Sequence, residues 1–464
     1  MDQNTPKRRI FLRTLGCPKN EVDSSVMQRH LEQAGWEVVN DPDSADVEII
    51  NTCGFIEPTK VESLEAIWES VERKEDMDDG RRVIVTGCLA QRYGQALAGE
   101  IVGIDAVIGF DRPDLILQAL NAAKTGAPAC WIEKPGLDYR DDSISHVWPS
   151  DKPAPLSSYI KISDGCDNAC RFCAIPLIRG RLRSRPKQAI VSEVASLVRA
   201  GTKEVILVAQ DTTSWGLDKP GDGDLADLLY ALNDIPANFW IRLMYAHPAF
   251  LSDRQIEAFR ECDKMIPYLD MPLQHISDRM LAIMNRHITK AETQAKIDRL
   301  RAARPGMALR TTFIIGHPGE TGADFDEMLE FAEANAFERM GAFPYSEEDS
   351  TPAARMEGKV PEDLTRERLS RLVEAFEYWS SEQSVDRLGS AVPCLMEQEN
   401  DGVWQGRTVF DAPEIDGQVT VAEPLPSPGL YEVILEGAEG VDFHGRRNRS
   451  FAVANAQPVE TSVE

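Results

Sequence analysis

The 464-residue sequence lacks long apolar runs. No stretch approaches the roughly 18 consecutive apolar residues that a membrane-spanning helix needs. Its opening residues, MDQNTPKRRIFLR, also lack the apolar core of a secretory signal. Hydrophobic residues nevertheless make up 42% of the chain, as in ordinary globular proteins. We therefore predict a cytoplasmic protein of several folded domains with no membrane partner.

Positive charge is scarce. The chain has 76 acidic and 50 basic side chains and a net charge of −26 at pH 7. Proteins that neutralise phosphates usually present net positive charge, so this balance disfavours general nucleic-acid binding and favours a basic partner.

Cysteine is also sparse. There are nine cysteines, an odd number, without the close spacing of a small disulfide-rich domain. We predict no disulfide partner, because thiols in such a chain more often serve metal or redox chemistry.

The apolar pattern predicts an α/β protein of three domains. In residues 8–124, short apolar runs alternate with helix-like segments, which is typical of a doubly wound α/β domain. Residues 125–151 are rich in Pro, Asp and Ser and are predicted to form a linker. Residues 152–388 hold six alternating strand–helix units. A complete barrel has eight such units in about 250 residues, so we predict a partial (βα)6 barrel. Residues 391–457 predict a small, OB-like β-barrel.

The strongest local signal is a Cys-x-x-x-Cys-x-x-Cys motif formed by Cys166, Cys170 and Cys173 directly after the first strand of the central domain. Three thiolates this close can hold one metal centre. A 4Fe-4S cluster normally takes four cysteines, so three would leave one iron open for chemistry. The alternative is a structural zinc site that borrows His146 or His247 as its fourth ligand.

A second set of cysteines is spread along the N-terminal domain. Cys17, Cys53 and Cys88 each follow a predicted strand, at intervals of 36 and 35 residues. The carboxyl ends of parallel strands lie along one edge of a sheet, so we expect the three thiols to converge. The alternative is ordinary packing, since free cysteine is often buried.

A basic stretch follows the Cys166 motif. No acidic residue lies between Asp167 and Glu193, whereas Arg179 and several further arginines do. These cations are candidates to balance thiolate–iron charge or to clamp a carboxylate. A solvated charged face is the alternative.

These motifs resemble known families. The cysteine motif after the first barrel strand resembles the radical S-adenosylmethionine superfamily. LGCPKNEVDS, INTCGF and VTGCLAQRY, with a terminal module like a TRAM domain, resemble the methylthiotransferase family over nearly the whole chain. LGCPKN, CAIPLIRGRLRSR, DMPLQHISDRML, MNRHIT and DAPEIDG resemble the branch that acts on small-subunit ribosomal protein twelve, rather than its tRNA-modifying relatives.

The resemblance implies two 4Fe-4S clusters, one on each cysteine set, and no catalytic residues beyond the cluster ligands. The open iron of the first would bind S-adenosylmethionine, whose reductive cleavage yields a radical that abstracts a hydrogen from the β-carbon of an aspartate. A second S-adenosylmethionine would supply the methyl group of a methylthio unit, and an external electron donor is required. The expected S-adenosylmethionine contacts are Gln210, Asp211, Arg310 and Gly316.

The third domain bears on the substrate. Residues 391–455 contain eleven acidic and four basic side chains. A module that binds RNA is expected to be basic, so this charge favours a basic protein such as a ribosomal protein. Three alternatives stay open: a tRNA methylthiotransferase, a zinc-stabilised RNA-binding protein, and a radical enzyme that stops at methyl or sulfur transfer.

Overall fold

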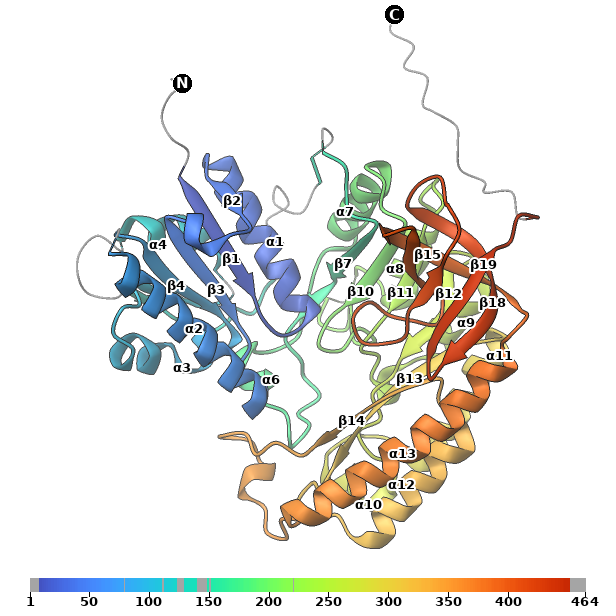
Figure 1. The fold of residues 1–464 in the computed structure, drawn as a ribbon. Helices are drawn as coiled ribbons and strands as arrows, with labels where there is room; N and C mark the ends of the chain where they lie inside the picture. Colours follow the sequence, from blue (N-terminus) through green and yellow to red (C-terminus); the bar gives the residue numbers. More distant parts are fainter. Residues whose placement is uncertain are drawn as a thin grey trace, which may run out of the picture.

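The computed structural model describes residues 8–78, 80–110, 112–122, 129–139, 148–149, 152–219 and 221–450. They form an N-terminal α/β unit, a central α/β unit and a C-terminal β unit, and the last two lie against each other (Figure 1). None of the helices in these segments is both long and apolar enough to cross a membrane.

The N-terminal unit is a six-stranded parallel sheet in the order β2-β1-β3-β4-β5-β6. Its strands are β1 (Arg9–Thr14), β2 (Glu37–Val39), β3 (Val47–Thr52), β4 (Arg82–Gly87), β5 (Ala106–Ile108) and β6 (Ala129–Trp131). Its helical segments are α1 (Pro18–Gln33), η1 (Pro42–Ser44), α2 (Glu57–Met77), α3 (Cys88–Glu100), η2 (Pro113–Leu115) and α4 (Ile116–Ala122).

Helices cover both faces of this sheet. Ile67 of α2 and Leu89 of α3 belong to the hydrophobic core on one face, and Leu31 of α1 and Ile116 of α4 belong to the core on the other. Strand β3 is buried along its whole length, as expected for a strand covered on both sides. The predicted doubly wound fold is confirmed.

The N-terminal sheet continues past residue 124. Strand β6 pairs with β5 and lies inside the segment 125–151 that the sequence predicts as a linker. Its three residues are too few to give a periodic signal of their own. The sheet therefore ends at Trp131 rather than before the predicted linker.

The central unit is a six-stranded parallel sheet in the order β14-β13-β12-β11-β10-β7. Its strands are β7 (Ser157–Lys161), β10 (Glu204–Val208), β11 (Trp240–Leu243), β12 (Met265–Asp270), β13 (Ala308–Ile315) and β14 (Arg339–Pro344), and β8 (Ser163–Asp164) pairs with β9 (Arg183–Ser184) beside them. Its helical segments are α6 (Ile175–Ile178), α7 (Lys187–Arg199), α8 (Leu225–Asn233), η3 (Pro248–Phe250), α9 (Asp253–Glu261), α10 (Asp278–Ile283), α11 (Lys290–Ala303), α12 (Gly322–Asn335), η4 (Ala353–Arg355) and α13 (Glu362–Asp386). Six parallel strands that do not close confirm the predicted partial barrel.

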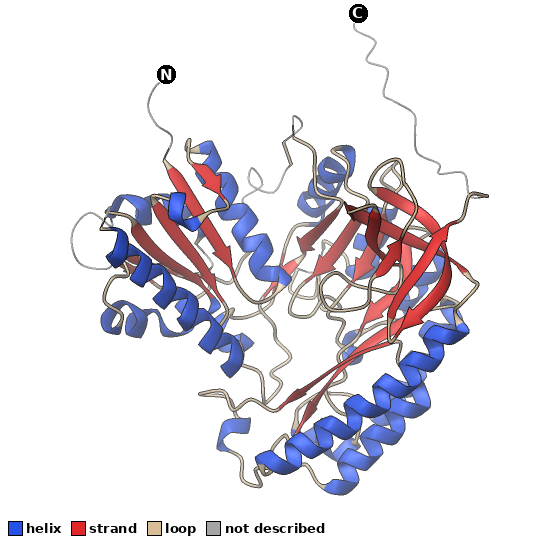
Figure 2. Ribbon diagram, in the orientation of Figure 1, coloured by secondary structure: helices blue, strands red, loops and turns tan. Residues whose placement is uncertain are grey.

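The C-terminal unit is a closed five-stranded barrel in the order β15-β16-β17-β19-β18, which confirms the predicted small β-barrel (Figure 2). Its strands are β15 (Ala391–Asn400), β16 (Val403–Thr408), β17 (Val419–Val421), β18 (Gly429–Glu439) and β19 (Asp442–Arg447).

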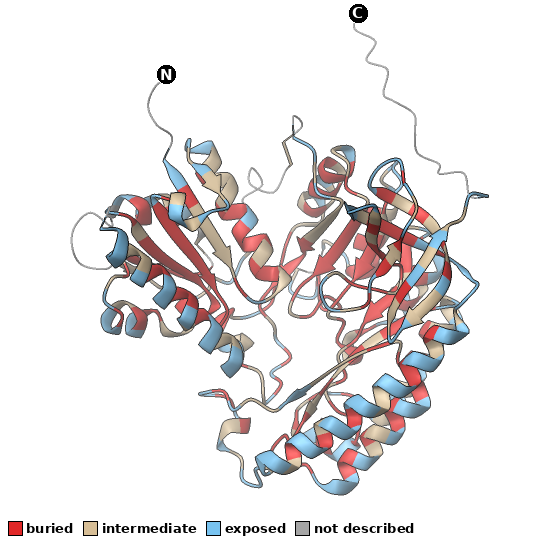
Figure 3. Ribbon diagram, in the orientation of Figure 1, coloured by how far each residue is buried: buried red, intermediate tan, exposed pale blue. Residues whose placement is uncertain are grey.

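The two faces of the central strands pack against different partners. In β10, Val205 and Leu207 belong to the core beneath the helices. Ile206 and Val208 alternate with them and belong to a second core shared with the C-terminal barrel. The central strands are buried as a consequence, whereas α13 keeps an exposed outer side (Figure 3).

Candidate iron–sulfur and cofactor site

The first cysteine set lies at one edge of the N-terminal sheet. Cys17 is the N-cap of α1, Cys53 follows β3, and Cys88 is the first residue of α3. Strands β1, β3 and β4, which precede them, are neighbours in the sheet. A Cβ added to Gly16 would lie 2.6 Å from the Cβ of Cys53 and 2.8 Å from its Sγ, so the turn before Cys17 rests against Cys53.

These thiols are crowded and largely buried. Burial raises the pKa of Cys88 to about 12 against the opposing effect of the Arg179 guanidinium, and the thiols of Cys17 and Cys53 raise it further. Burial likewise raises the pKa of Cys53. Such thiols ionise readily only when a cationic centre lies among them. A cysteine-only donor set of this kind fits an iron–sulfur cluster.

The second cysteine set lies on the loop between β8 and α6. The backbone N–H of Cys166 donates to the carbonyl of Gly180 at 3.2 Å, and that of Cys173 donates to the carbonyl of Cys170 at 3.1 Å. Nη1 of Arg286 donates to Sγ of Cys170 at 3.3 Å. Burial raises the pKa of Cys173 to about 12, and the neighbouring Cys170 adds to the effect. This donor set also fits an iron–sulfur cluster.

The zinc alternative needs four ligands around a single ion. Within the part of the chain that the structure describes, no three His, Cys, Asp or Glu side chains are placed to share one metal ion. His146 lies outside the described residues. His247 is buried, and its Nδ1 accepts a hydrogen bond from the backbone N–H of Ala249 at 3.2 Å.

Gln210 and Asp211, which follow β10, differ in how they are held. Both polar atoms of the Gln210 side chain are buried and have no hydrogen-bond partner among the described residues. Asp211 is fully engaged: it accepts hydrogen bonds from the hydroxyls of Thr213 and Ser214 and from Nδ2 of Asn168, at 2.5 to 2.8 Å. Asn168 lies between Cys166 and Cys170, so Asp211 fixes the cysteine loop.

Arg310 and Gly316 lie on and just after β13. Arg310 donates to Asp270 at 3.1 Å and to Asp416 of the C-terminal unit at 3.2 Å, so its guanidinium lies at a domain contact. Gly316 has a φ of +80°, and its N–H donates to the Glu320 carboxylate at 2.9 Å.

Two further buried polar atoms near this edge were not singled out as cofactor contacts from the sequence. Oε1 of Gln274 and Nε2 of His317 have no partner among the described residues. The ring of His317 packs edge-on against Phe172, with centroids 6.3 Å apart, and Phe172 precedes Cys173. Unpaired buried polar atoms are costly, so His317 beside the cysteine loop is a candidate contact for a polar ligand. His317 follows β13, and the end of a barrel strand is where a sequence predicts ligand contacts.

The comparisons with known proteins agree with this layout. Residues 9–109 match the model described as Uncharacterized protein family UPF0004, residues 160–332 match the Radical SAM superfamily, and residues 388–447 match the TRAM domain. A ribosomal protein uS12 methylthiotransferase RimO from Thermosipho africanus is 40% identical over 94% of this chain and 99% of its own. That from Desulfitobacterium hafniense is 42% identical over 92% and 95%. The chain belongs to the RimO family of ribosomal protein uS12 methylthiotransferases.

A solved structure has the same kind of fold. The radical S-adenosylmethionine methyltransferase TsrM from Kitasatospora setae, described with cobalamin and a [4Fe-4S] cluster bound, aligns with a TM-score of 0.52 at 14% identity. The alignment covers 86% of this chain and 77% of TsrM. The likeness extends across most of the chain, which places the RimO family chain among radical S-adenosylmethionine folds.

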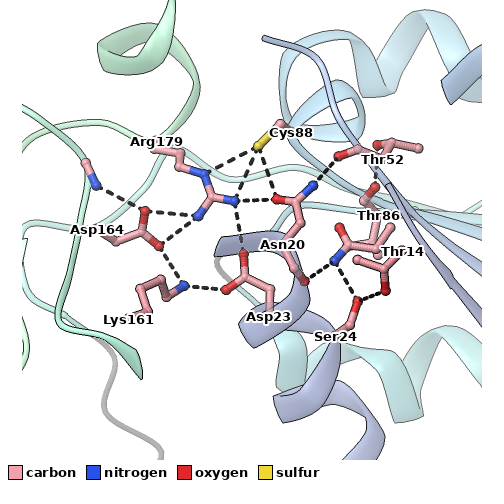
Figure 4. Close-up of polar contacts among 12 residues, drawn as sticks. Thr14, Asn20, Asp23, Ser24, Thr52, Thr86, Cys88, Lys161, Asp164 and Arg179 are labelled. Atoms are coloured by element: carbon pink, nitrogen blue, oxygen red, sulfur yellow. Dashed lines mark hydrogen bonds and ion pairs between the residues drawn. The ribbon is translucent and has the colours of Figure 1, made fainter. Parts of the chain in front are cut away.

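Within this RimO family chain, a buried ionic network joins the two cysteine regions (Figure 4). Arg179, six residues after Cys173, donates to Asp164 at 3.0 and 3.1 Å and to Asp23 of α1 at 3.0 Å. Lys161 pairs with both carboxylates. Nη2 and Nε of Arg179 also lie 3.3 and 3.4 Å from Sγ of Cys88. Arg179 thus contacts a thiol and two buried carboxylates of this chain, whereas Arg181 of the same basic stretch is exposed.

Apolar packing brings the two cysteine sets still closer. Cys88, Ala174 and Ile178 form one hydrophobic cluster of buried residues, and Ala174 directly follows Cys173. A member of the first set therefore packs against the segment that carries the second.

A second domain contact lies beyond β14. Glu348 pairs with Arg92 at 2.6 Å and with Lys60 at 3.1 Å, and the side chain of Asp349 accepts a hydrogen bond from Tyr93 at 3.1 Å. The N-terminal unit is thus held to the central unit at this place as well as through the Arg179 network.

Proposed function

We propose that this chain methylthiolates the β-carbon of an aspartate in small-subunit ribosomal protein uS12, using two 4Fe-4S clusters and S-adenosylmethionine. The observation that carries the proposal is the packing of Cys88 against Ala174, immediately after Cys173. It supports a geometry in which a radical-forming cluster and a sulfur-handling cluster serve one substrate atom.

Each cysteine set has a separate task in this proposal. Cys166, Cys170 and Cys173 hold the cluster that binds S-adenosylmethionine, and Cys17, Cys53 and Cys88 hold the auxiliary cluster. When bound, the two clusters and S-adenosylmethionine would pass on the electron from the external donor and provide the radical and the methylthio group. The chain's own residues orient these groups and exclude water around them.

We assign the S-adenosylmethionine contacts by what each side chain has left to offer. Gln210 has an unpaired buried amide, so it suits direct contact. Gly316 already donates its N–H to Glu320, so we assign it the turn after β13 rather than a direct contact. Asp211 acts through Asn168 on the cysteine loop. Arg310 is engaged with two carboxylates and acts as a positioning group.

The substrate assignment rests on family and charge. The relatives with 40% and 42% identity carry the name of a uS12 enzyme, and the C-terminal barrel is acidic, which suits a basic protein better than RNA. The reaction needs an external electron donor, and we expect it in the cytoplasm, on free or ribosome-bound uS12.

The test is to reconstitute the protein anaerobically and incubate it with reductant, S-adenosylmethionine, sulfide and purified uS12. A parallel reaction contains tRNA in place of uS12. We expect uS12 to gain the mass of a methylthio group on one aspartate, located by tandem mass spectrometry, with tRNA unchanged.

Other outcomes identify the alternatives. A methylthiolated tRNA with unmodified uS12 would keep the chemistry and overturn the substrate. A mass gain of a methyl group or of sulfur alone would indicate partial transfer. Zinc in place of iron and sulfide, without a brown chromophore, would indicate the RNA-binding alternative.

A further inference from the structure

The guanidinium of Arg179 reaches across a domain boundary. The side chain is 1% exposed, and its charge lies over the ring of Phe110, 4.4 Å from the centroid. Besides its contacts with Asp23 and Asp164, Nη2 donates to Oδ1 of Asn20 at 2.8 Å. Arg181, two residues on, is by contrast exposed and pairs with Asp167.

Buried charges surround Arg179. Arg179 and Lys161 pair with the carboxylates of Asp23 and Asp164, and a third buried cation, Arg183, donates to the carbonyl of Arg179. A thiolate at Cys88 adds a further buried negative charge, and two guanidinium N–H groups point at its sulfur. Such charge-assisted contacts strengthen where water is excluded.

The position of Arg179 in the chain links both cysteine sets. It is the C-cap of α6, the short helix that directly follows Cys173. Its backbone N–H donates to the carbonyl of Ile175 at 2.7 Å, and its carbonyl accepts from Nη2 of Arg183. The backbone of Arg179 is therefore held by the segment that follows Cys173, and its side chain contacts Cys88 of the first cysteine set.

We propose that Arg179 is a positioning residue that donates hydrogen bonds to the auxiliary cluster through Cys88 and raises the reduction potential of that cluster. The inference rests on the proposed function, because it requires an iron–sulfur cluster on the first cysteine set. Reduction adds negative charge to a cluster, and hydrogen bonds to its sulfurs stabilise that charge. Arg179 thus makes the auxiliary cluster easier to reduce while the central domain is docked against it.

The test uses full-length protein in which Cys166, Cys170 and Cys173 are all replaced by Ala, so that only the auxiliary cluster forms. Into this parent we introduce Arg179→Met with Asp164→Asn, which removes the cation together with one buried carboxylate and leaves the net charge unchanged. The midpoint potential is measured by redox titration followed by electron paramagnetic resonance, with iron content and circular dichroism as checks. We expect a lower midpoint potential than in the parent.

The matched control is Arg185→Met with Glu193→Gln in the same parent. Arg185 is also a fully buried arginine of the central unit, paired with Glu193 at 2.7 Å, and it donates to the carbonyl of Lys161. We expect its midpoint potential to equal that of the parent. Arg179→Lys keeps a positive charge but loses the guanidinium fork, so we expect an intermediate potential.

Each outcome decides a different point. Equal potentials in the parent and in the Arg179 double variant would overturn the inference and leave the proposed function intact. If that double variant fails to fold, the midpoint potential of Arg179→Lys is compared with that of the parent instead, and equal values would overturn the inference. A parent that binds no iron–sulfur cluster would contradict the proposed function itself.

Discussion

At the residue scale, buried ion pairs hold the C-terminal barrel on the central sheet. Glu204 of β10 accepts from Arg242 of β11 at 2.7 Å and from Arg407 of β16 at 2.6 Å, and all three side chains are buried. Burial opposes ionisation of this carboxyl, but the two guanidiniums outweigh that effect and hold its pKa at about 2. Removing one partner of such a group leaves uncompensated buried charge.

We predict that Glu204→Gln destabilises the protein by about 3 to 5 kcal/mol, because Arg242 and Arg407 would lose their shared carboxylate. The apparent free energy of unfolding of the cluster-free protein in urea measures the effect. Glu436→Gln is the control: its partner Arg446 is exposed, so we expect a change below about 1 kcal/mol. Equal losses in the two variants would contradict the prediction.

The same residue gives a pH dependence. Because the folded-state pKa of Glu204 is depressed, its contribution is fully present above the unfolded-state pKa of about 4.3 and disappears as the pH falls toward 2. We expect the stability difference between wild type and Glu204→Gln to be constant from pH 8 to about 5 and to shrink below that.

His275 predicts a second pH effect, in a different window. Burial lowers the pKa of His275 to about 3, and its Nδ1 accepts hydrogen bonds from the backbone N–H groups of Ile276 and Ser277. Between pH 6.5 and 3 the unfolded chain therefore binds a proton that the folded chain does not, so wild type loses stability as the pH falls. His275→Asn keeps an acceptor and removes this loss. We expect the free energy of unfolding of wild type, relative to that of His275→Asn, to fall by up to about 1.4 kcal/mol per pH unit in that window. Urea unfolding measures both values, and a difference that does not change with pH would contradict the prediction.

At the element scale, tight turns after the strands of the N-terminal sheet position the first cysteine set. Gly16, with a φ of +90°, brings the turn before α1 onto Cys53. Gly87, with a φ of +96°, brings the turn that leads into Cys88 against Asn51 and Thr52 at the end of β3. A side chain at either glycine needs both strained backbone and space that is occupied.

We therefore predict that Gly16→Ala displaces Cys53 and costs the reconstituted protein its auxiliary cluster, which is half of its iron. Iron and sulfide analysis after anaerobic reconstitution measures the loss. Gly99→Ala in α3 is the control, because a Cβ there meets nothing within 4 Å, and we expect full iron content. Full iron in Gly16→Ala would show that the turn does not position the ligand.

The elements also show what a sequence can and cannot predict. The strand ends before Cys17, Cys53 and Cys88 were predictable, because parallel strands share one carboxyl edge. The contact between Arg179 and Cys88 joins residues 91 positions apart in different units, and it depends on how those units pack. Local sequence patterns carry no information about how two folded units are oriented against each other.

At the scale of the whole molecule, the C-terminal barrel docks on the central sheet. It packs on the strand face that carries Ile206 and Tyr268. Tyr268 also donates to Asp416 of that barrel at 2.7 Å. The sequence predicted the barrel but not its docking site, which is formed by inward-facing residues of separate strands.

The acidic C-terminal barrel gives a whole-molecule prediction. Asp401 and Glu439 are exposed on its hairpins. We expect Asp401→Asn with Glu439→Lys to slow association with uS12 severalfold at low salt, because electrostatic steering weakens, and the effect should vanish at high salt. Stopped-flow association rates measure it. Asp76→Asn with Glu75→Lys on α2 makes the same charge change on another unit and serves as the control. Equal slowing of association in both double variants would show that net charge, and not the charge of the barrel, sets the rate.

The central claim is that one chain carries two clusters with different tasks. Its most direct test is one mass-spectrometric measurement of 5′-deoxyadenosine and of methylthiolated uS12 in the same anaerobic reaction, for wild type, Cys17→Ala and Cys166→Ala. We predict both products from wild type, 5′-deoxyadenosine without methylthiolated uS12 from Cys17→Ala, and neither from Cys166→Ala. Methylthiolated uS12 from the Cys17→Ala variant would contradict the account.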